Sequence, residues 1–210
     1  MLNEMTNAIA EKITTYPIVE TFHSVQGEGN YTGVSAFFLR LGGCDVACPW
    51  CDTKESWNAK PHPKRSVLEL AEEVKQAQPA IAIITGGEPL LHNLTPLTTA
   101  IREQNIPVHL ETSGSHPFSG EFDWVTFSPK QFKAPHSSIY PHVNELKVVI
   151  VNEYDLKWAE QQSALVPPET VKYLQPEWNT PQSKDLIFKY ILKNPQWRIS
   201  LQTHKLLQVR

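Results

Sequence analysis

The stretch Gly43-Cys44-Asp45-Val46-Ala47-Cys48-Pro49-Trp50-Cys51-Asp52-Thr53 contains all three cysteines of the chain. Cys44, Cys48 and Cys51 follow the pattern CxxxCxxC, and the short spacers let three thiolates converge on one small inorganic group if the segment loops around it. A chain of 210 residues can bury a core without disulfides. Closely spaced cysteines in a reducing compartment are more often metal-binding or catalytic than disulfide-forming.

The number of cysteines separates the kinds of site that this stretch could form. A structural zinc site is almost always closed by four ligands, so it would also need a carboxylate or one of the eight histidines. A 4Fe-4S cluster is usually held by four cysteines, so three would leave one iron open to an outside ligand. Three buried thiols without a metal are the remaining alternative. The spacing favours the cluster because it supplies three ligands.

Composition describes an ordinary globular protein, with 40% hydrophobic residues, 20% charged residues and a net charge of -3. No basic stripe predicts binding to nucleic acid. No apolar run approaches the ~20 residues of a membrane span, and residues 1–15 lack the pattern of a signal peptide. We therefore expect a cytoplasmic protein with one domain over residues 1–210, in which residues 1–16 form an irregular leader.

Hydrophobic periodicity and capping signals divide the chain into strands and helices. Ser66 and Glu69 form a capping box, Asn152 is an expected N-cap, and Thr95-Pro96 and Thr180-Pro181 are expected caps with proline in the first turn. Helices are therefore predicted at residues 66–78, 95–105, 152–165 and from 180 onward. Strands are predicted at residues 18–22, 34–41, 81–84, 108–110, 122–127, 145–151, 171–174 and 197–201.

The order of these elements predicts the fold class. From residue 34 onward it is strand, helix, strand, helix, three strands, helix, strand, helix, strand, which is typical of a mostly parallel sheet with crossover helices. We expect an α/β fold, an incomplete (β/α) barrel of about six mostly parallel strands, because the chain has too few repeats for eight units. Polar clusters follow the carboxyl ends of most strands, where ligands bind in such folds.

Further motifs accompany the cysteines and carry a family resemblance. They are Val25-Gln26-Gly27-Glu28-Gly29, Thr85-Gly86-Gly87-Glu88-Pro89, Ser128-Pro129-Lys130, Gln175-Pro176-Glu177 and the terminal Leu201-Gln202-Thr203-His204-Lys205. With CxxxCxxC and GGEP the chain resembles the radical S-adenosylmethionine superfamily. The combination with QGEG and LQTHK resembles one family in it, the 7-carboxy-7-deazaguanine synthases of queuosine biosynthesis, over nearly the whole chain.

The resemblance implies two of the cofactors. In that superfamily the three cysteines hold a 4Fe-4S cluster, whose open iron binds the amino and carboxylate groups of S-adenosylmethionine, and an electron from the cluster yields a 5′-deoxyadenosyl radical. From the residues alone, most of the polar motifs could equally be caps or turns. The residues that the resemblance assigns to S-adenosylmethionine are Trp50, Cys51, Asp52, Gly87, Glu88, Ser113, Ser128, Pro129, Lys130, Gln175, Pro176, Glu177 and Trp178.

The resemblance also implies a Mg²⁺ ion and a pterin site. Thr53 would bind Mg²⁺, for which a hydroxyl is a suitable hard donor. Gln26 and Glu28 offer an amide and a carboxylate to a pterin edge, and Arg40 could pair with a substrate carboxylate or form a structural salt bridge. The implied substrate residues are Val25, Gln26, Gly27, Glu28, Arg40, Thr85, His204 and Arg210, the last through its terminal carboxylate.

The implied activity is a lyase reaction that converts 6-carboxy-5,6,7,8-tetrahydropterin to 7-carboxy-7-deazaguanine with loss of ammonia. The resemblance also implies a homodimer, and the cluster requires an electron donor such as a flavodoxin. Two other functions fit part of the sequence. An enzyme that activates a glycyl-radical partner would share CxxxCxxC and GGEP but not QGEG or LQTHK, and a zinc-binding interaction module would have no catalytic activity.

Overall fold

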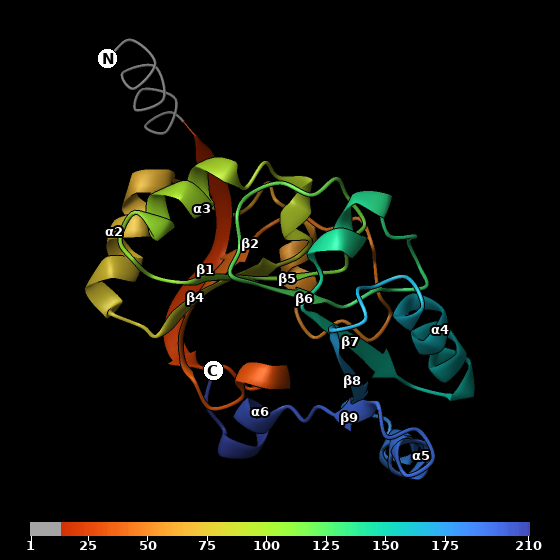
Figure 1. Cartoon of the computed structure of the whole chain (residues 1–210). Coiled ribbons are helices and arrows are strands. Elements are labelled where there is room, and N and C mark those ends of the chain that lie inside the picture. The colour runs from red at the N-terminus through yellow and green to blue at the C-terminus, as the bar shows by residue number, and fades with distance from the viewer. Residues whose placement is uncertain (1–13) are drawn as a thin grey trace.

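The computed structural model describes residues 14–210, and a single sheet of nine strands is its framework (Figure 1). The order across the sheet is β3-β1-β2-β4-β5-β6-β7-β8-β9. The strands are β1 (Thr15–Val25), β2 (Ser35–Leu41), β3 (Lys64–Ser66), β4 (Ile81–Gly86), β5 (Val108–Thr112), β6 (Trp124–Phe127), β7 (Glu145–Ile150), β8 (Val171–Pro176) and β9 (Trp197–Ile199).

Neighbouring strands from β2 to β9 pair in parallel, whereas β1 is antiparallel to β2 and to β3. The α/β class and the parallel sheet are confirmed, and the elements predicted after residue 34 occur in the expected order, with β3 and α6 in addition. The expected count of about six strands is too low, because it was taken from residue 34 onward, which leaves out β1, and because the three residues of β3 were not predicted.

Helices cover the outer face of the sheet. They are α2 (Val67–Ala77), α3 (Thr95–Arg102), α4 (Glu153–Ser163) and α5 (Gln182–Ile191). The short helix α6 (Thr203–Leu207) lies at the rim of the sheet, and 3₁₀ turns occur at Gly29–Tyr31, Lys54–Trp57, Pro89–Leu91 and Ser137–His142. Figure 1 shows α2 and α3 together at one end of the sheet, with α4 and α5 at the other. The core between helices and strands is apolar; Leu39, Ile84, Leu97 and Leu110 have no exposed surface. Burial on both faces explains why the central strands read as continuous apolar runs.

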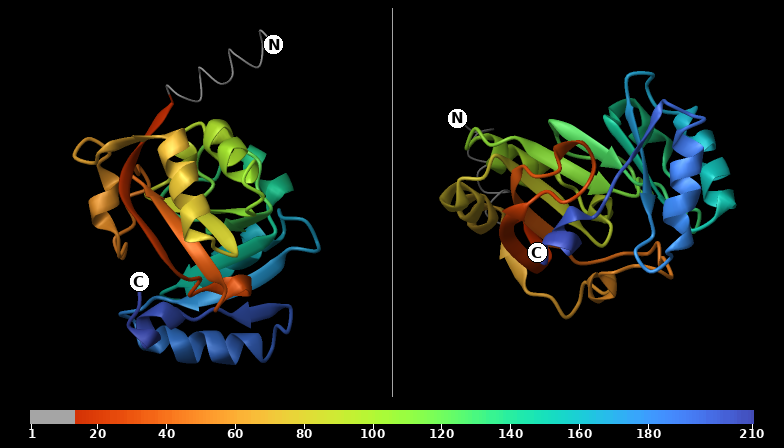
Figure 2. Two further views of the ribbon diagram at one scale, coloured as in Figure 1. Left: turned by 90° about the vertical axis from the view of Figure 1, so that its left-hand side faces the viewer. Right: turned by 90° about the horizontal axis from the view of Figure 1, so that it is seen from below.

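The sheet does not close into a barrel, and its open side is bridged by loops instead. The loop after β1 meets the segment after β9: Thr203 N donates to Gly27 O at 2.9 Å, and Gly29 N donates to Ser200 Oγ at 3.0 Å. Both views in Figure 2 place the C-terminal segment beside the start of the chain's first loop. The expected incomplete barrel is thus confirmed, and contacts between the two ends of the described chain complete its rim.

Some predicted boundaries are wrong. The leader predicted for residues 1–16 lies mostly outside the described residues, but Thr15 and Tyr16 belong to β1, and Tyr16 is buried because it pairs with β3. The two Thr-Pro signals start their helices differently from the prediction. Thr95 is the first residue of α3, after Leu94 as N-cap, and α5 begins after Pro181. The residues of α6 were not predicted to be helical.

Replacing Ser66 by alanine is expected to lower the free energy of unfolding by about 1 kcal/mol. The capping box is present as predicted: Glu69 N donates to Ser66 Oγ at 3.3 Å, and Ser66 N donates to Glu69 Oε2 at 2.8 Å. Urea unfolding of the two proteins measures the difference. Thr95→Ala is the control, since Thr95 caps nothing with its side chain; an equal loss in both variants would contradict the assignment.

Candidate active site

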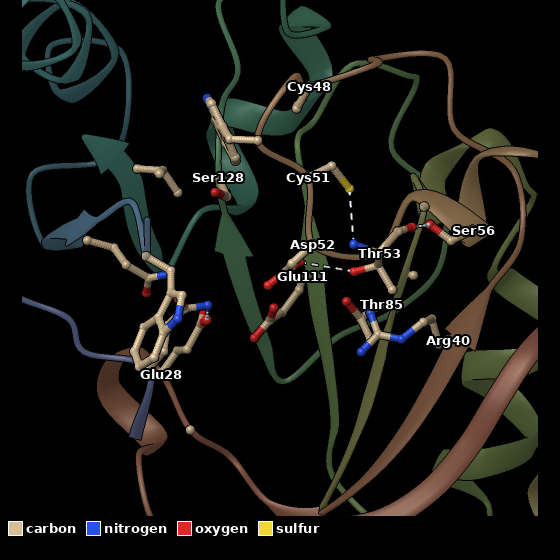
Figure 3. A pocket seen from close by; sticks show the side chains of 18 of the residues that line it. Glu28, Arg40, Cys48, Cys51, Asp52, Thr53, Ser56, Thr85, Glu111 and Ser128 are labelled. Atoms are coloured by element: carbon tan, nitrogen blue, oxygen red, sulfur yellow. Dashed lines mark hydrogen bonds between the residues drawn. The ribbon is translucent and has the colours of Figure 1, made fainter. Parts of the chain in front are cut away.

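One cavity of about 690 Å³ opens at the carboxyl ends of the parallel strands (Figure 3). This volume lies within the range of small-molecule and cofactor sites. Most of the sequence-predicted site residues line it: Val25, Gln26, Gly27, Glu28, Arg40, Cys44, Cys48, Trp50, Cys51, Asp52, Thr53, Thr85, Gly87, Ser113, Ser128, Lys130, Gln175, Pro176, Glu177, Trp178, His204 and Arg210. Glu88 and Pro129 are the two predicted residues that do not line it.

The cysteine loop forms one wall of this cavity. Cys48 is buried, Cys44 and Cys51 are partly exposed, and all three are free thiols. Backbone hydrogen bonds fix the start of the loop, from Cys44 N to Trp57 O at 3.0 Å and from Gly43 N to Ser56 O at 2.7 Å. Burial raises the pKa of the Cys48 thiol to about 11, so binding of a metal there would release a proton.

The arrangement of these thiols fits a cluster better than a single ion. Within residues 14–210, no three side chains of His, Cys, Asp or Glu stand close enough together to hold one metal ion. Yet the three thiols line a common cavity. This arrangement suits a cluster, in which each thiol would bind a different iron atom. The alternative of a closed zinc site therefore lacks the four convergent ligands that it needs.

The glycine pair Gly86-Gly87, at the end of β4, lets this part of the backbone pack directly against the backbone at Leu41 and Gly43, beside the cysteine loop. A Cβ on Gly87 would lie 2.2 Å from Gly43 O and 2.9 Å from Cys44 Cβ. Gly86 has a φ of 135°, and a Cβ there would lie 2.2 Å from Leu41 O. Only glycine fits at either position, so the cavity wall next to the cysteines is bare backbone.

Glu88 lies behind this wall and organises it. Its carboxylate is buried and accepts hydrogen bonds from Leu90 N at 3.0 Å, Thr112 Oγ1 at 2.5 Å and Ser113 N at 2.8 Å, and also from Ser113 Oγ. It was predicted to bind the cofactor, but its oxygens are occupied inside the protein. Its effect on a bound ligand would pass through Ser113, which does line the cavity.

Lys130 occupies the wall beside Cys48. Its Nζ donates to Ser128 O at 2.5 Å and to Ser128 Oγ at 2.6 Å, and it lies 5.6 Å from the ring centroid of Trp50. Burial lowers the pKa of Lys130, and Cys48 opposes that shift. Pro129 lies between Ser128 and Lys130 in the chain but does not itself line the cavity.

The motif Gln175-Pro176-Glu177, at the end of β8, contributes a buried amide and a turn. Gln175 Oε1 accepts from Ser200 Oγ at 2.8 Å. Glu177 accepts from Asn179 N at 3.1 Å and from Thr180 Oγ1 at 2.6 Å, so its carboxylate caps the turn before α5. Trp178 is partly exposed at the rim, where Lys205 Nζ lies 5.1 Å from its ring centroid.

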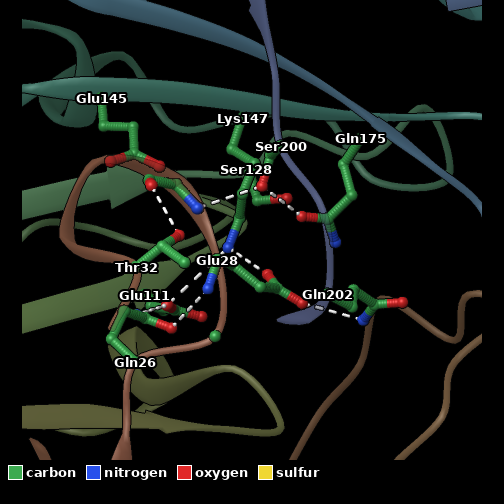
Figure 4. A network of polar contacts seen from close by, with 12 residues as sticks. Gln26, Glu28, Thr32, Glu111, Ser128, Glu145, Lys147, Gln175, Ser200 and Gln202 are labelled. Carbon is green, nitrogen blue, oxygen red and sulfur yellow. Dashed lines mark hydrogen bonds and ion pairs between the residues drawn. The ribbon is translucent and has the colours of Figure 1, made fainter. Parts of the chain in front are cut away.

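The loop after β1 carries a buried ion pair that the sequence did not predict (Figure 4). Glu28 Oε2 pairs with Lys147 Nζ, and Glu28 Oε1 accepts from Gln202 Nε2 at 2.8 Å. Burial alone would raise the pKa of Glu28, but Lys147 outweighs it and holds this pKa below its ordinary value. Burial likewise opposes the charge of Lys147, yet the carboxylates of Glu111, Glu28 and Glu145 raise its pKa.

Arg40 forms the structural salt bridge that was its alternative interpretation, and it also lines the cavity. Its Nε donates to Glu20 Oε1 at 2.9 Å. Glu20 Oε2 pairs at 2.6 Å with the guanidinium of Arg210, whose backbone O accepts from Ser24 Oγ at 2.5 Å. Arg210 is therefore held at the rim close to Arg40. Arg40 in turn lies opposite Thr85, its partner in the pairing of β2 with β4.

The C-terminal segment links the loop after β1 with the cysteine loop. His204 packs against Gly27 so closely that a Cβ there would lie 2.1 Å from His204 Nδ1, and burial lowers the pKa of His204. Lys205 Nζ donates to Asp52 Oδ2 at 2.9 Å and to Gln202 Oε1 at 3.0 Å. Thr53 Oγ1 donates to Asp52 Oδ1 at 3.1 Å, so the oxygen can still accept a hydrogen bond or bind a cation, and Thr53 lines the cavity.

Comparison with known proteins identifies the family. A model of the Radical SAM superfamily matches residues 39–131. The chain is 53% identical to a 7-carboxy-7-deazaguanine synthase of Synechocystis sp., covering 96% of this chain and 98% of that protein, and 43% identical to one of Flavobacterium psychrophilum over the full length of both. The chain belongs to the 7-carboxy-7-deazaguanine synthase family.

A solved structure agrees with this assignment to the 7-carboxy-7-deazaguanine synthase family. QueE from Escherichia coli superposes with a TM-score of 0.83 at 30% identity, over 93% of this chain and 97% of that one. The chain is thus a radical S-adenosylmethionine enzyme, a lyase of queuosine biosynthesis, and the superfamily implies a 4Fe-4S cluster and S-adenosylmethionine. No helix in the described residues is long and apolar enough to cross a membrane.

Proposed function

We propose that this protein converts 6-carboxy-5,6,7,8-tetrahydropterin to 7-carboxy-7-deazaguanine with loss of ammonia, in the cytosol. The observation that supports this is the joining of three features in one cavity: the three thiols, the bare Gly87 wall and a polar floor that contains Arg40 and Glu28. The cavity is large enough for a cofactor and a bicyclic substrate side by side.

The walls divide between the two ligands. Cys44, Cys48 and Cys51 would hold the cluster, while the backbone at Gly87, the Ser113 and Ser128 hydroxyls and the motif at the end of β8 would bind S-adenosylmethionine. When bound, the cluster and S-adenosylmethionine supply the radical that removes a hydrogen atom from the substrate. The protein then has to bind and orient the reactants and exclude water.

Substrate would lie against the floor formed by β2, β4, β5 and β7. The guanidinium of Arg40 can pair with the substrate carboxylate through the nitrogens that Glu20 does not use. Thr53 Oγ1 would bind a Mg²⁺ ion that shares this carboxylate, since Mg²⁺ takes few protein ligands and keeps positions for substrate and water. The terminal residue Arg210 and the ring of His204 close the rim above it.

Product formation is expected only when iron, sulfide, S-adenosylmethionine, a reductant and the tetrahydropterin are all supplied anaerobically, and omission of Mg²⁺ should lower the rate. Liquid chromatography with mass detection of 7-carboxy-7-deazaguanine is the measurement. Incubation with a glycyl-radical protein in place of the pterin is the control. A brown, iron-loaded protein that cleaves S-adenosylmethionine but leaves the pterin unchanged would contradict the proposed substrate.

The alternative activities lack a supporting observation. The C-terminal segment covers the rim and contacts Gly27, so the cavity suits a small molecule better than a protein segment. The homodimer and the flavodoxin-type electron donor stay predictions that rest on the family resemblance.

A further inference from the structure

A side chain that the proposed function does not use holds the cysteine loop from outside the cavity. Asp45 follows Cys44 in this loop, and its Oδ2 accepts from Lys133 Nζ at 2.5 Å. His116 Nε2 lies 3.0 Å from Asp45 Oδ1 and 3.0 Å from Lys133 Nζ, so it can donate to the carboxylate or accept from the ammonium group. We call Asp45, His116 and Lys133 the Asp45 anchor.

The two partners of Asp45 belong to loops that carry serines of the cavity wall. His116 lies shortly after Ser113, in the loop that follows β5, and Lys133 lies shortly after Ser128, in the loop that follows β6. Both serines line the cavity. The anchor therefore joins the cysteine loop to the two loops that would bind S-adenosylmethionine through these hydroxyls.

The loops after β5 and β6 are themselves tied together. His136 N donates to Gly114 O at 2.7 Å. Lys133 forms an antiparallel bridge with Lys130, whose Nζ donates to Ser128 Oγ at 2.6 Å. Asp45 is thus bound to a surface that hydrogen bonds between these two loops already hold in place.

The loop after β6 contacts the cysteine loop a second time, on the other side of Cys48 in the chain. The ring of Trp50 meets that of Phe132 edge to face, with 6.4 Å between the ring centroids, and Lys130 Nζ lies 5.6 Å from the Trp50 centroid. Contacts with residues 130–133 therefore flank Cys48 on both sides.

The backbone of the cysteine loop also requires support from its surroundings. Ala47, between Asp45 and Cys48, has a φ of 54°, in the left-handed region that residues other than glycine rarely adopt. Such a conformation persists only where the neighbouring structure enforces it. Backbone hydrogen bonds at Gly43 and Cys44 fix the start of the loop, and the Asp45 anchor holds the turn that follows.

The location of the anchor indicates how it acts. None of its three residues lines the cavity, so it would act through the position of the cysteine loop and not through contact with a ligand. The Asp45 side chain is 46% exposed, and an ion pair so close to solvent contributes little to the stability of the whole fold. Its effect should therefore be local to the loop.

We propose that Asp45, His116 and Lys133 are positioning residues that hold the cysteine loop, and with it the cluster, at the spacing from the loops after β5 and β6 that S-adenosylmethionine requires. The inference rests on the proposed assignment of these walls to the cluster and to S-adenosylmethionine, and it does not depend on which substrate the enzyme converts.

The affinity of the reconstituted, reduced enzyme for S-adenosylmethionine tests the inference. Titration followed by the electron paramagnetic resonance spectrum of the cluster gives the dissociation constant. Without the anchor the loop is in the binding position for a smaller fraction of the time, so Asp45→Ala should bind S-adenosylmethionine roughly 3- to 10-fold more weakly. Lys133→Met should have a similar or smaller effect, and the double variant should match Asp45→Ala, because the two side chains act as a pair.

Further readouts separate positioning from a general structural role. Asp45→Glu keeps the carboxylate and should restore most of the affinity, and Glu121→Ala, whose side chain is 79% exposed, is the surface control that should change nothing. Iron content and the free energy of unfolding of the apoprotein should stay at wild-type values in Asp45→Ala and Lys133→Met.

Three results would overturn the inference: wild-type affinity in both single variants, single losses that multiply in the double variant, or loss of iron or of apoprotein stability in both single variants. A wild type that binds S-adenosylmethionine but leaves the pterin unchanged would contradict the proposed function, whereas the affinities would still decide the role of the anchor.

Discussion

Replacing Cys48 by alanine is expected to reduce formation of 7-carboxy-7-deazaguanine below detection. Cys48 is the buried member of the three thiols that line the cavity, and two remaining cysteines cannot hold a cluster that is already one ligand short of the usual four. The variant should lack the brown colour and the visible absorption of the reconstituted wild type. Iron and sulfide content, together with the product assay, are the measurements.

The fold should survive this substitution, which separates loss of cofactor from loss of structure. The core of the sheet is built from apolar side chains outside the cysteine loop, and the Cys48 thiol is not among them. The apoprotein of the variant should therefore melt within a few degrees of the wild-type apoprotein. A variant that folds, contains no iron and still forms product would refute the assignment of the cluster to these thiols.

The sequence predicted the fold through local signals that do not depend on tertiary contacts. The apolar runs of β2, β4 and β7 and the caps at Ser66 and Asn152 appear where they were expected. It predicted only residues 18–22 of β1 and missed β3, because short or mixed strands gain their order from pairing with neighbours rather than from their own pattern. The helix α6 is likewise held by polar contacts of Thr203 and Lys205 with distant loops.

The candidate site was predicted where a motif marked it and missed where a single polar residue sat in an apolar strand. Lys147 in the run ELKVVI and Glu111 in VHLET contribute one charge each to the inner face. Side chains alternate between the two faces of a strand, so Glu145 and Lys147 lie on the same face. This spacing could have predicted that the two charges lie close together. The pairing of Lys147 with Glu28, 119 residues away, depends on the tertiary fold and is invisible in the sequence.

The inner face of the sheet carries a buried cluster of charged side chains. The carboxylates of Glu28, Glu111 and Glu145 converge on one buried ammonium group, and Glu145 is buried against Trp124 Nε1 at 3.2 Å and Asn30 N at 3.1 Å. Such a cluster is stable only while its cation is present, because an unpaired buried charge is costly. The floor of the cavity is therefore charged and ordered before any substrate binds.

Replacing Lys147 by methionine is expected to lower the free energy of unfolding by about 3–5 kcal/mol at neutral pH. The methionine fills a similar volume but leaves the Glu28 and Glu111 carboxylates without their cation. In the wild type, the lowered pKa of Glu28 contributes stability above its ordinary value of 4.5, and this stability is lost as the pH falls through the lowered pKa. The raised pKa of Lys147 contributes stability that is lost only in strong alkali.

In the variant the pKa of Glu28 is expected to shift in the opposite direction. Without Lys147, burial dominates and raises the pKa of Glu28, so protonation relieves the penalty and the deficit in stability should shrink as the pH falls from 7 to 5. Burial already raises the pKa of Glu145 and Lys147 opposes that shift, so removal of Lys147 should raise this pKa further and add to the same trend. Urea unfolding of both apoproteins at several pH values is the measurement, with exposed Lys75→Met as the control. A deficit that stays constant over this range would show that Lys147 stabilises the fold through its packing and not through its charge.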